Sequence, residues 1–193
     1  MAYNPNIHHR RSIRLQGYDY AQEGLYFITI CCHNKTCHFG TIENKEMVLS
    51  LYGKIAYNKW LNLSERFSNF ELDVFQIMPN HMHGIIVLNT PKAETVTGGG
   101  GEFIGDDIGV TGALLGTGAG ASPAPTIGDI IGAYKSLVAN QILEIFKSHN
   151  QTMGKLWQRN YHDHIIRDEQ AYQKISNYII HNPENWKDDT FYT

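Results

Sequence analysis

The sequence lacks an excess of basic residues. It holds 16 Lys and Arg against 19 Asp and Glu, which gives a formal net charge of -3. Proteins that coat nucleic acid regardless of its sequence depend on a large positive charge, so this class is excluded. Any contact with DNA has to come from a local basic patch.

Cysteine and long apolar runs are also scarce. The cysteines are Cys31, Cys32 and Cys37, an odd number, and no secretion signal precedes them. This pattern favours free thiols in a reducing compartment. No apolar run approaches the roughly 18–20 residues that a membrane span requires. We therefore expect a cytoplasmic protein with no membrane partner, associated with the nucleoid if it binds DNA.

The composition is that of a globular protein. Of the 193 residues, 42% are hydrophobic and 18% are charged, which is enough for the core of one domain over residues 1–193. Two appendages are expected, a basic arm over residues 1–20 and a flexible Gly-rich insert over residues 95–125. The insert lacks the glycine patterns of nucleotide-binding loops. Three arginines cluster in the arm: Arg10, Arg11 and Arg14.

The hydrophobic periodicity predicts an α+β fold. β-Branched and aromatic residues predict strands at residues 25–32, 70–78, 81–88 and 161–167. Apolar residues at helical spacing predict helices at residues 45–67, 126–147 and 169–181. The turn dipeptide Pro79-Asn80 predicts an antiparallel hairpin between the second and third strands. The resulting order is β-α-β-β-α-β with an extra C-terminal helix, which is the ferredoxin-like (RRM-like) topology with an antiparallel sheet.

Two histidines stand two residues apart at the head of the third predicted strand. In a strand, His81 and His83 share one face and Met82 takes the other. Their attachment points are then about 7 Å apart, close enough for two imidazoles to converge on one metal ion. A lone His-x-His pair is more often a surface or core feature, so a metal site needs further support.

A second polar pair stands on the last predicted helix. Tyr178 and Asn182 are four residues apart and share one helical face, and Pro183 ends the helix. If this face covers the strand of His81 and His83, it adds an amide oxygen that can complete a metal site. It also adds a phenol that can attack a phosphate. A metal would act as a Lewis acid on the phosphate oxygens and favour the phenolate.

Several motifs together resemble a known family. They are Leu25-Tyr26-Phe27-Ile28-Thr29, Met78-Pro79-Asn80-His81-Met82-His83, Trp157-Gln158, His162-Asp163-His164-Ile165-Ile166-Arg167 and Tyr178-Ile179-Ile180-His181-Asn182-Pro183. This set is similar to the single-tyrosine HUH transposases. More narrowly, it resembles the REP-associated tyrosine transposases, a domesticated bacterial branch related to insertion-sequence transposases.

The resemblance implies a Mg²⁺- or Mn²⁺-dependent endonuclease and transposase that acts on hairpin-forming single-stranded DNA. It would cleave and rejoin the DNA through a covalent phosphotyrosine. By position, Tyr178 is the nucleophile, and the metal ligands are His81, His83 and Asn182. Contacts with DNA are expected from a further set: Arg10, Arg11, Arg14, His164 and Arg167. Mobile relatives are homodimers that exchange their tyrosine helices, and the sequence leaves open whether this chain does the same.

Competing interpretations use other residues. His162 and His164 form a second His-x-His pair that could ligate the metal, although a DNA contact by His164 is favoured. Tyr172 lies six residues before Tyr178 and is expected to pack on another side of the helix. Zinc binding by the cysteines is disfavoured, because adjacent strand residues face opposite ways.

The main rival function is a catalytically idle protein that binds hairpin DNA or RNA on the same fold. An RNA-binding domain of the RRM type is disfavoured, because the aromatic signature of its central strands is absent from this chain.

Overall fold

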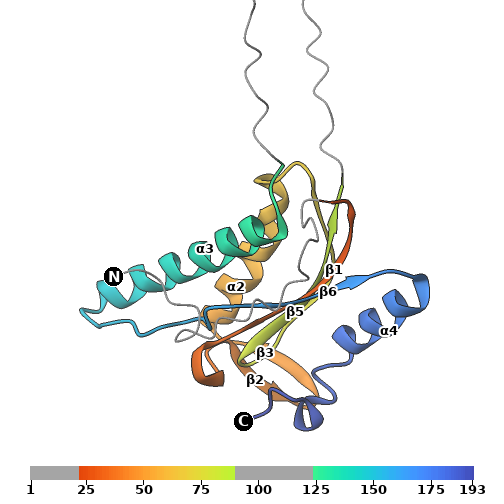
Figure 1. Ribbon diagram of the computed structural model, residues 1–193. Helices are drawn as coiled ribbons and strands as arrows, with labels where there is room; N and C mark the ends of the chain where they lie inside the picture. The colour runs from red at the N-terminus through yellow and green to blue at the C-terminus, as the bar shows by residue number, and fades with distance from the viewer. Residues whose placement is uncertain (1–21, 90–123) are drawn as a thin grey trace, which may run out of the picture.

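The chain folds into a four-stranded antiparallel sheet with helices on both faces (Figure 1). The structure is a computed structural model, and it describes residues 22–89 and 124–193. The strands of this sheet are β1 (Gly24–Cys31), β4 (Phe70–Ile77), β5 (His81–Leu88) and β6 (His162–Ile166). The helices are α2 (Leu51–Leu61), α3 (Ile127–Ser148) and α4 (Glu169–Ile180).

The sheet has the strand order β4-β5-β1-β6. Its strands and helices follow one another as β-α-β-β-α-β with α4 added at the end, so the predicted ferredoxin-like arrangement is confirmed. The predicted arm at residues 1–20 lies outside the described residues. So does the insert predicted at residues 95–125, except for its last two positions. Among the residues described, no helix has the length and apolar character to cross a membrane.

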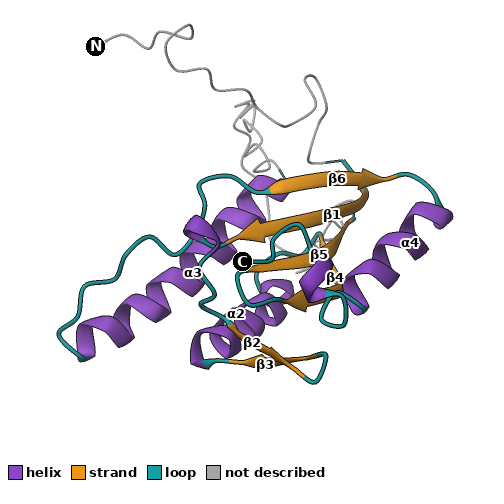
Figure 2. Cartoon of the chain, turned by 90° about the horizontal axis from the view of Figure 1, so that it is seen from below, coloured by secondary structure: helices purple, strands orange, loops and turns teal. Residues whose placement is uncertain are grey.

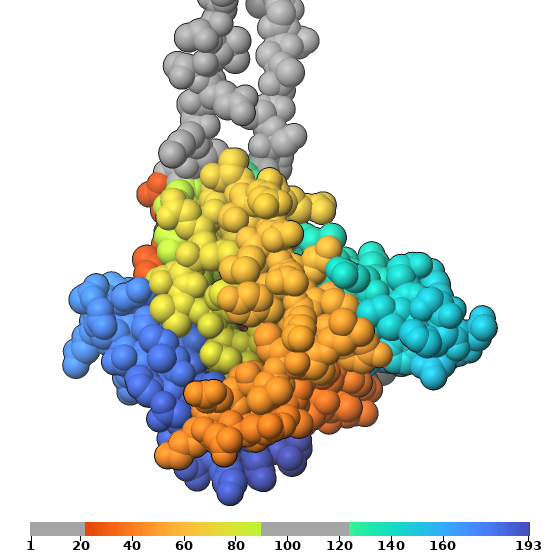
Figure 3. All heavy atoms as spheres, turned by 180° about the vertical axis from the view of Figure 1, so that it is seen from behind, coloured from red at the N-terminus to blue at the C-terminus, as the bar shows by residue number. Residues whose placement is uncertain are grey.

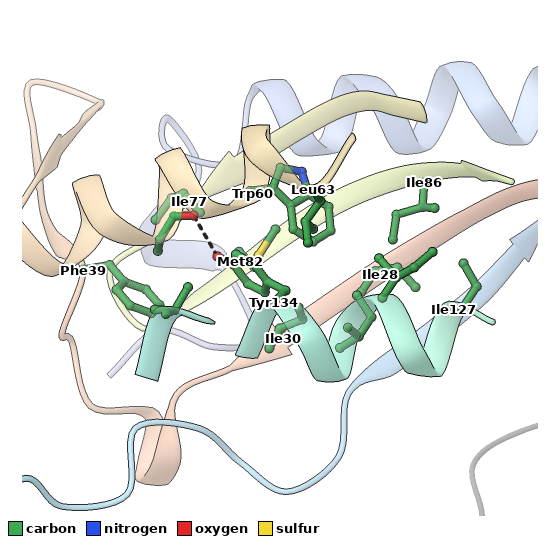
Figure 4. Packing of buried hydrophobic residues seen from close by; sticks show 14 of the residues in the cluster. Ile28, Ile30, Phe39, Trp60, Leu63, Ile77, Met82, Ile86, Ile127 and Tyr134 are labelled. Carbon is green, nitrogen blue, oxygen red and sulfur yellow. Dashed lines mark hydrogen bonds between the residues drawn. The ribbon is translucent and has the colours of Figure 1, made fainter. Parts of the chain in front are cut away.

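One face of the sheet forms the main core with α2 and α3 (Figures 1 and 2). Alternate residues of β1, namely Tyr26, Ile28 and Ile30, point into this core and are fully buried. Trp60 of α2 and Tyr134 of α3 meet edge to face there, with ring centroids 5.0 Å apart (Figure 4). The β-branched and aromatic residues that predicted the strand therefore supply its buried face at every second position.

Gly84 of β5 lies directly beneath the Trp60 ring. A Cβ atom built at this position would lie 3.0 Å from Cζ2 of Trp60 and 3.2 Å from Cβ of Phe75. We expect Gly84→Ala to lower the free energy of unfolding by about 1–3 kcal/mol, because a packed core has to shift to admit the methyl group. Chemical denaturation measures this change.

The matched control is Gly132→Ala on α3. A Cβ at Gly132 would have no atom within 4 Å, and alanine favours a helix by about 0.5–1 kcal/mol over glycine. A similar loss of stability in both variants would contradict the close packing of Gly84 against Trp60.

The opposite face of the sheet is partly covered by α4. Ile85, Ile166 and Ile179 form a small buried cluster there, and Tyr172 packs against it. The expectation that Tyr172 serves packing is thus confirmed. The α4 helix begins at Asp168, whose side chain accepts a hydrogen bond from the backbone N–H of Ala171. Because α4 packs on β4 and β5, its last turn is held beside the start of β5.

The prediction of a helix from residue 45 is wrong. The structure has a hairpin there, β2 (Gly40–Glu43) with β3 (Glu46–Leu49), and α2 begins only at Leu51. Asn44 and Lys45 both have positive φ angles, as a tight two-residue hairpin turn requires. Met47, counted as helical, lies in β3, where Met47 and Leu49 are half-buried and alternate with exposed residues.

Candidate active site

His81 and His83 lie side by side at the start of β5. Both side chains are buried, with 0% and 1% exposure, and their Nε2 atoms are 3.0 Å apart. The predicted hairpin places them there, because Met78 and His81 close the turn between β4 and β5 with a backbone hydrogen bond. The two imidazoles share one face, as the alternation of strand residues predicted.

The outer nitrogens of the two imidazoles have fixed partners. Nδ1 of His81 lies 2.9 Å from Oδ1 of Asn80. The Asn80 amide nitrogen donates to the backbone oxygens of Lys35 and Phe191, so its Oδ1 can only accept. His81 therefore carries its proton on Nδ1 and leaves a lone pair on Nε2.

His83 has a more adaptable partner. Its Nδ1 lies 2.8 Å from the Thr29 hydroxyl on the neighbouring strand β1. A hydroxyl can donate or accept, so this contact suits either neutral tautomer of His83. Such outer partners orient imidazoles that bind a metal.

Burial keeps both imidazoles neutral. It lowers the pKa of His81 to about 3, and the charge of Lys35 adds to the effect. It also lowers the pKa of His83 well below the usual value; neighbouring His81 adds to this shift and Asp189 opposes it. The neutral imidazole is the form that ligates a metal ion.

Tyr178 reaches the histidine pair from α4. Its hydroxyl lies 3.1 Å from Nε2 of His83 and donates to Oδ2 of Asp189, also over 3.1 Å. Burial of the hydroxyl and the Asp189 carboxylate raise the pKa of Tyr178 above its usual value. The side chain is still 42% exposed, so the phenol lies between the buried pair and the surface.

Asp189 was missed by the sequence analysis. Its carboxylate accepts from Tyr178, from the Asn182 amide at 2.7 Å and from the backbone N–H of Phe191 at 2.6 Å. Ligand atoms of His81, His83 and Asp189 all lie within 4.8 Å of one another. The only signal in the sequence is an acidic pair, Asp188 and Asp189, shortly after the proline that ends the helix.

Asn182 lies next to this group. It is 2% exposed, and its amide nitrogen donates to Asp189. Its Oδ1 is buried with no hydrogen-bond partner among the described residues. An unpaired buried acceptor costs about 1–3 kcal/mol, which makes this oxygen available to a ligand. The role of Asn182 as a metal ligand stays a prediction.

The C-terminal segment, residues 183–193, packs against the histidine pair with its aromatic side chains. The Phe191 ring lies 4.6 Å from the His81 ring, and the Trp186 ring lies 5.9 Å from it, measured between centroids. On the Tyr178 side, a hollow of about 320 Å³ is lined by Lys174, His181 and other residues. A substrate can therefore approach the hydroxyl of Tyr178 from this side.

The remaining predicted site residues lie apart from the group. His162 and His164 are exposed on β6, opposite Thr29 and Phe27 of β1, so they share the face of the histidine pair without joining its ligand atoms. Arg167 is exposed just after β6. DNA contacts by His164 and Arg167 stay predictions. Arg10, Arg11 and Arg14 fall outside the described residues.

The cysteines show no zinc site in the described part of the chain. Cys31 and Cys32 are buried and Cys37 is exposed, all three as free thiols. The one group of potential metal ligands found among the described residues contains no cysteine.

No family model matches the chain. An uncharacterized protein of Haemophilus influenzae is 41% identical over 194 residues, covering 98% of this chain and 97% of that protein.

Two solved structures are similar at 15% identity. A REP-associated tyrosine transposase bound to a REP hairpin has a TM-score of 0.49, with 90% of this chain and 74% of that chain covered. A transposase candidate of Deinococcus radiodurans R1 has a TM-score of 0.45, with 88% and 96% covered.

Proposed function

We propose that this chain, which belongs to the same family as the uncharacterized Haemophilus influenzae protein, is a metal-dependent endonuclease for single-stranded DNA. It would act as a transposase or nickase on hairpin-forming DNA, with Tyr178 as the nucleophile and a covalent phosphotyrosine as the intermediate. One observation carries the proposal: the Tyr178 hydroxyl lies 3.1 Å from Nε2 of His83, a member of the buried histidine pair, and 3.1 Å from Oδ2 of Asp189.

The residues fit a divalent metal ion. Two neutral imidazoles present Nε2 atoms to each other, a carboxylate lies within reach of both, and the Asn182 oxygen is buried without a partner. We assign His81, His83 and Asp189 as ligands, with the Asn182 oxygen as a fourth candidate. Mixed nitrogen and oxygen donors suit Mn²⁺ better than Mg²⁺, which prefers oxygen alone. When bound, the metal supplies Lewis-acid stabilisation of the phosphate oxygens.

The chain's own residues supply the nucleophile and a proton acceptor. The Tyr178 oxygen forms a bond to phosphorus, and the bond from phosphorus to the 3′-oxygen of the leaving strand breaks. The phenol proton passes along the existing hydrogen bond to Asp189, and the leaving 3′-oxygen takes a proton from solvent. The reverse attack by a 3′-hydroxyl rejoins the strand and returns the proton to Tyr178.

A second candidate function is a catalytically idle protein that binds hairpins. The observation that favours it is the burial of the histidine pair behind Phe191. Only the endonuclease would form a covalent product with the DNA. A labelled pool of single-stranded hairpins with randomised flanks, incubated with the protein and Mn²⁺, is expected to give an adduct that survives denaturation. Binding of the pool with no adduct would establish the idle protein instead.

Thr29 provides a test of the metal site alone. We expect Thr29→Val to weaken Mn²⁺ binding by about 10- to 100-fold, because it leaves Nδ1 of His83 buried without its partner while the side-chain shape is kept. Calorimetric titration with Mn²⁺ measures the affinity. The control is Thr152→Val, at an exposed position of the loop before β6. Equal affinities for the two variants would contradict the assignment of His83 as a ligand.

A further inference from the structure

We propose that the groove between the β2–β3 hairpin and the C-terminal segment binds an unpaired base of the single-stranded DNA close to the cleaved phosphate. This inference rests on the proposed function, and it assigns a role to a hairpin that adds nothing to the four-stranded sheet. In Figures 1 and 3 the hairpin and the C-terminal segment lie against each other at one end of the molecule.

The groove has the size of a small-molecule site. Its volume is about 630 Å³, and it is lined by β2 and the turn of the hairpin, by Cys37 and Pro79, and by the chain that follows α4. Small-molecule sites span roughly 300–1,000 Å³. The β2–β3 hairpin forms one wall of the groove. The shape of this wall is fixed, because Asn44 and Lys45 form a two-residue turn with both φ angles positive.

The side chains in the groove suit a nucleotide. Trp186 and Tyr192 line it, with ring centroids 5.4 Å apart and the Tyr192 side chain 48% exposed. Aromatic side chains of this kind stack on bases of any sequence. Lys45 and Lys187 can each pair with a phosphate, and the carboxylates of Glu184 and Asp188, which balance their charge, can accept hydrogen bonds from the amino groups of a base.

The groove adjoins the candidate active site. The Trp186 ring that lines it lies 5.9 Å from the His81 ring. Tyr192 directly follows Phe191, whose ring covers both histidines. Asp188 lines both this groove and the hollow beside Tyr178, so a strand whose base is held against Tyr192 can run past Asp188 toward the Tyr178 hydroxyl.

Photochemical crosslinking tests the groove without requiring cleavage. The probe is a 12-residue oligodeoxythymidine with one 5-iododeoxyuridine, irradiated with the full-length protein and mapped by mass spectrometry. We expect crosslinks at Tyr192 or Trp186. We also expect Tyr192→Ala to lose the Tyr192 crosslink and to weaken binding of the oligonucleotide about 5- to 30-fold. The matched control is Tyr57→Ala on α2, which removes a tyrosine of similar exposure, 39%.

The outcomes separate this inference from the proposed function. Crosslinks confined to other surfaces, wild-type binding by Tyr192→Ala or no binding by the wild type would overturn the groove assignment. A protein that forms the Tyr178 adduct but shows none of the groove effects loses only this inference. A protein that crosslinks at the groove but never forms an adduct on hairpin DNA loses only the proposed endonuclease activity.

Discussion

Tyr178→Phe is expected to abolish the covalent protein–DNA adduct while the protein still binds hairpin DNA. The substitution removes the attacking oxygen and keeps the ring that packs edge to face against Phe27 at 6.2 Å. Loss of the hydrogen bonds to His83 and Asp189 at a partly exposed site should change the free energy of unfolding by only about 1 kcal/mol. Adduct formation should fall by more than about 10³-fold, because no other group replaces a nucleophile.

The control is Tyr172→Phe on the same helix. Tyr172 packs against the cluster of Ile85, Ile166 and Ile179, and it is absent from the hydrogen bonds that join Tyr178 to His83 and Asp189, so this variant should form the adduct as the wild type does. The adduct is measured on denaturing gels with labelled hairpin DNA and Mn²⁺, and binding is measured separately by electrophoretic shift. If Tyr178→Phe still forms the adduct and Tyr172→Phe does not, the nucleophile is Tyr172 and the assignment of Tyr178 is wrong.

The order of the fold could be predicted because each main element carries a period of its own. In residues 24–31 the side chains that face α2 and α3 (Tyr26, Ile28 and Ile30) recur at every second position and are fully buried, while those on the opposite face range from half-buried to buried. The 22 residues of α3 carry apolar side chains every three or four positions, and the capping box of Thr126 and Asp129 marks the start. These are local signals that tertiary contacts do not reverse.

The β2–β3 hairpin could not be predicted in the same way. Its strands have four residues each, too few for a period to be counted. Met47, Leu51 and Ile55 happen to stand four apart, which is also helical spacing. The hairpin depends on the turn at Asn44 and Lys45, where both residues have positive φ angles. This conformation is common for asparagine but rare for lysine, so the sequence did not point to it.

The candidate site could likewise be predicted from the sequence only in part. His81 and His83 follow from strand alternation, and Tyr178 with Asn182 from helical spacing. Asp189 follows from neither, because it lies beyond the helix in a segment that a 3-10 turn at Trp186–Asp188 folds back over β5. Its position depends on long-range contacts, such as the Asn80 amide that holds the Phe191 carbonyl. A single sequence gives no measure of such contacts.

Asp189→Asn is expected to slow adduct formation by roughly 10²- to 10⁴-fold, the range for loss of a general base. The substitution keeps the shape of the side chain but removes the charge that accepts the Tyr178 proton. It also removes a charged ligand from the group of His81 and His83. Single-turnover adduct formation with excess protein over hairpin DNA measures the rate, and titration with Mn²⁺ measures the metal affinity.

Asp163→Asn on β6 is the matched control, because Asp163 is half-buried, as Asp189 is, and lines neither the hollow beside Tyr178 nor the groove. It should react at the wild-type rate. If Asp189→Asn loses both rate and Mn²⁺ affinity, Asp189 is a metal ligand as well as the proton acceptor, as proposed. If it loses rate alone, Asp189 is the proton acceptor and the metal depends on the Asn182 oxygen instead. A wild-type rate for Asp189→Asn would remove this carboxylate from the mechanism and leave His83 as the partner of the Tyr178 hydroxyl.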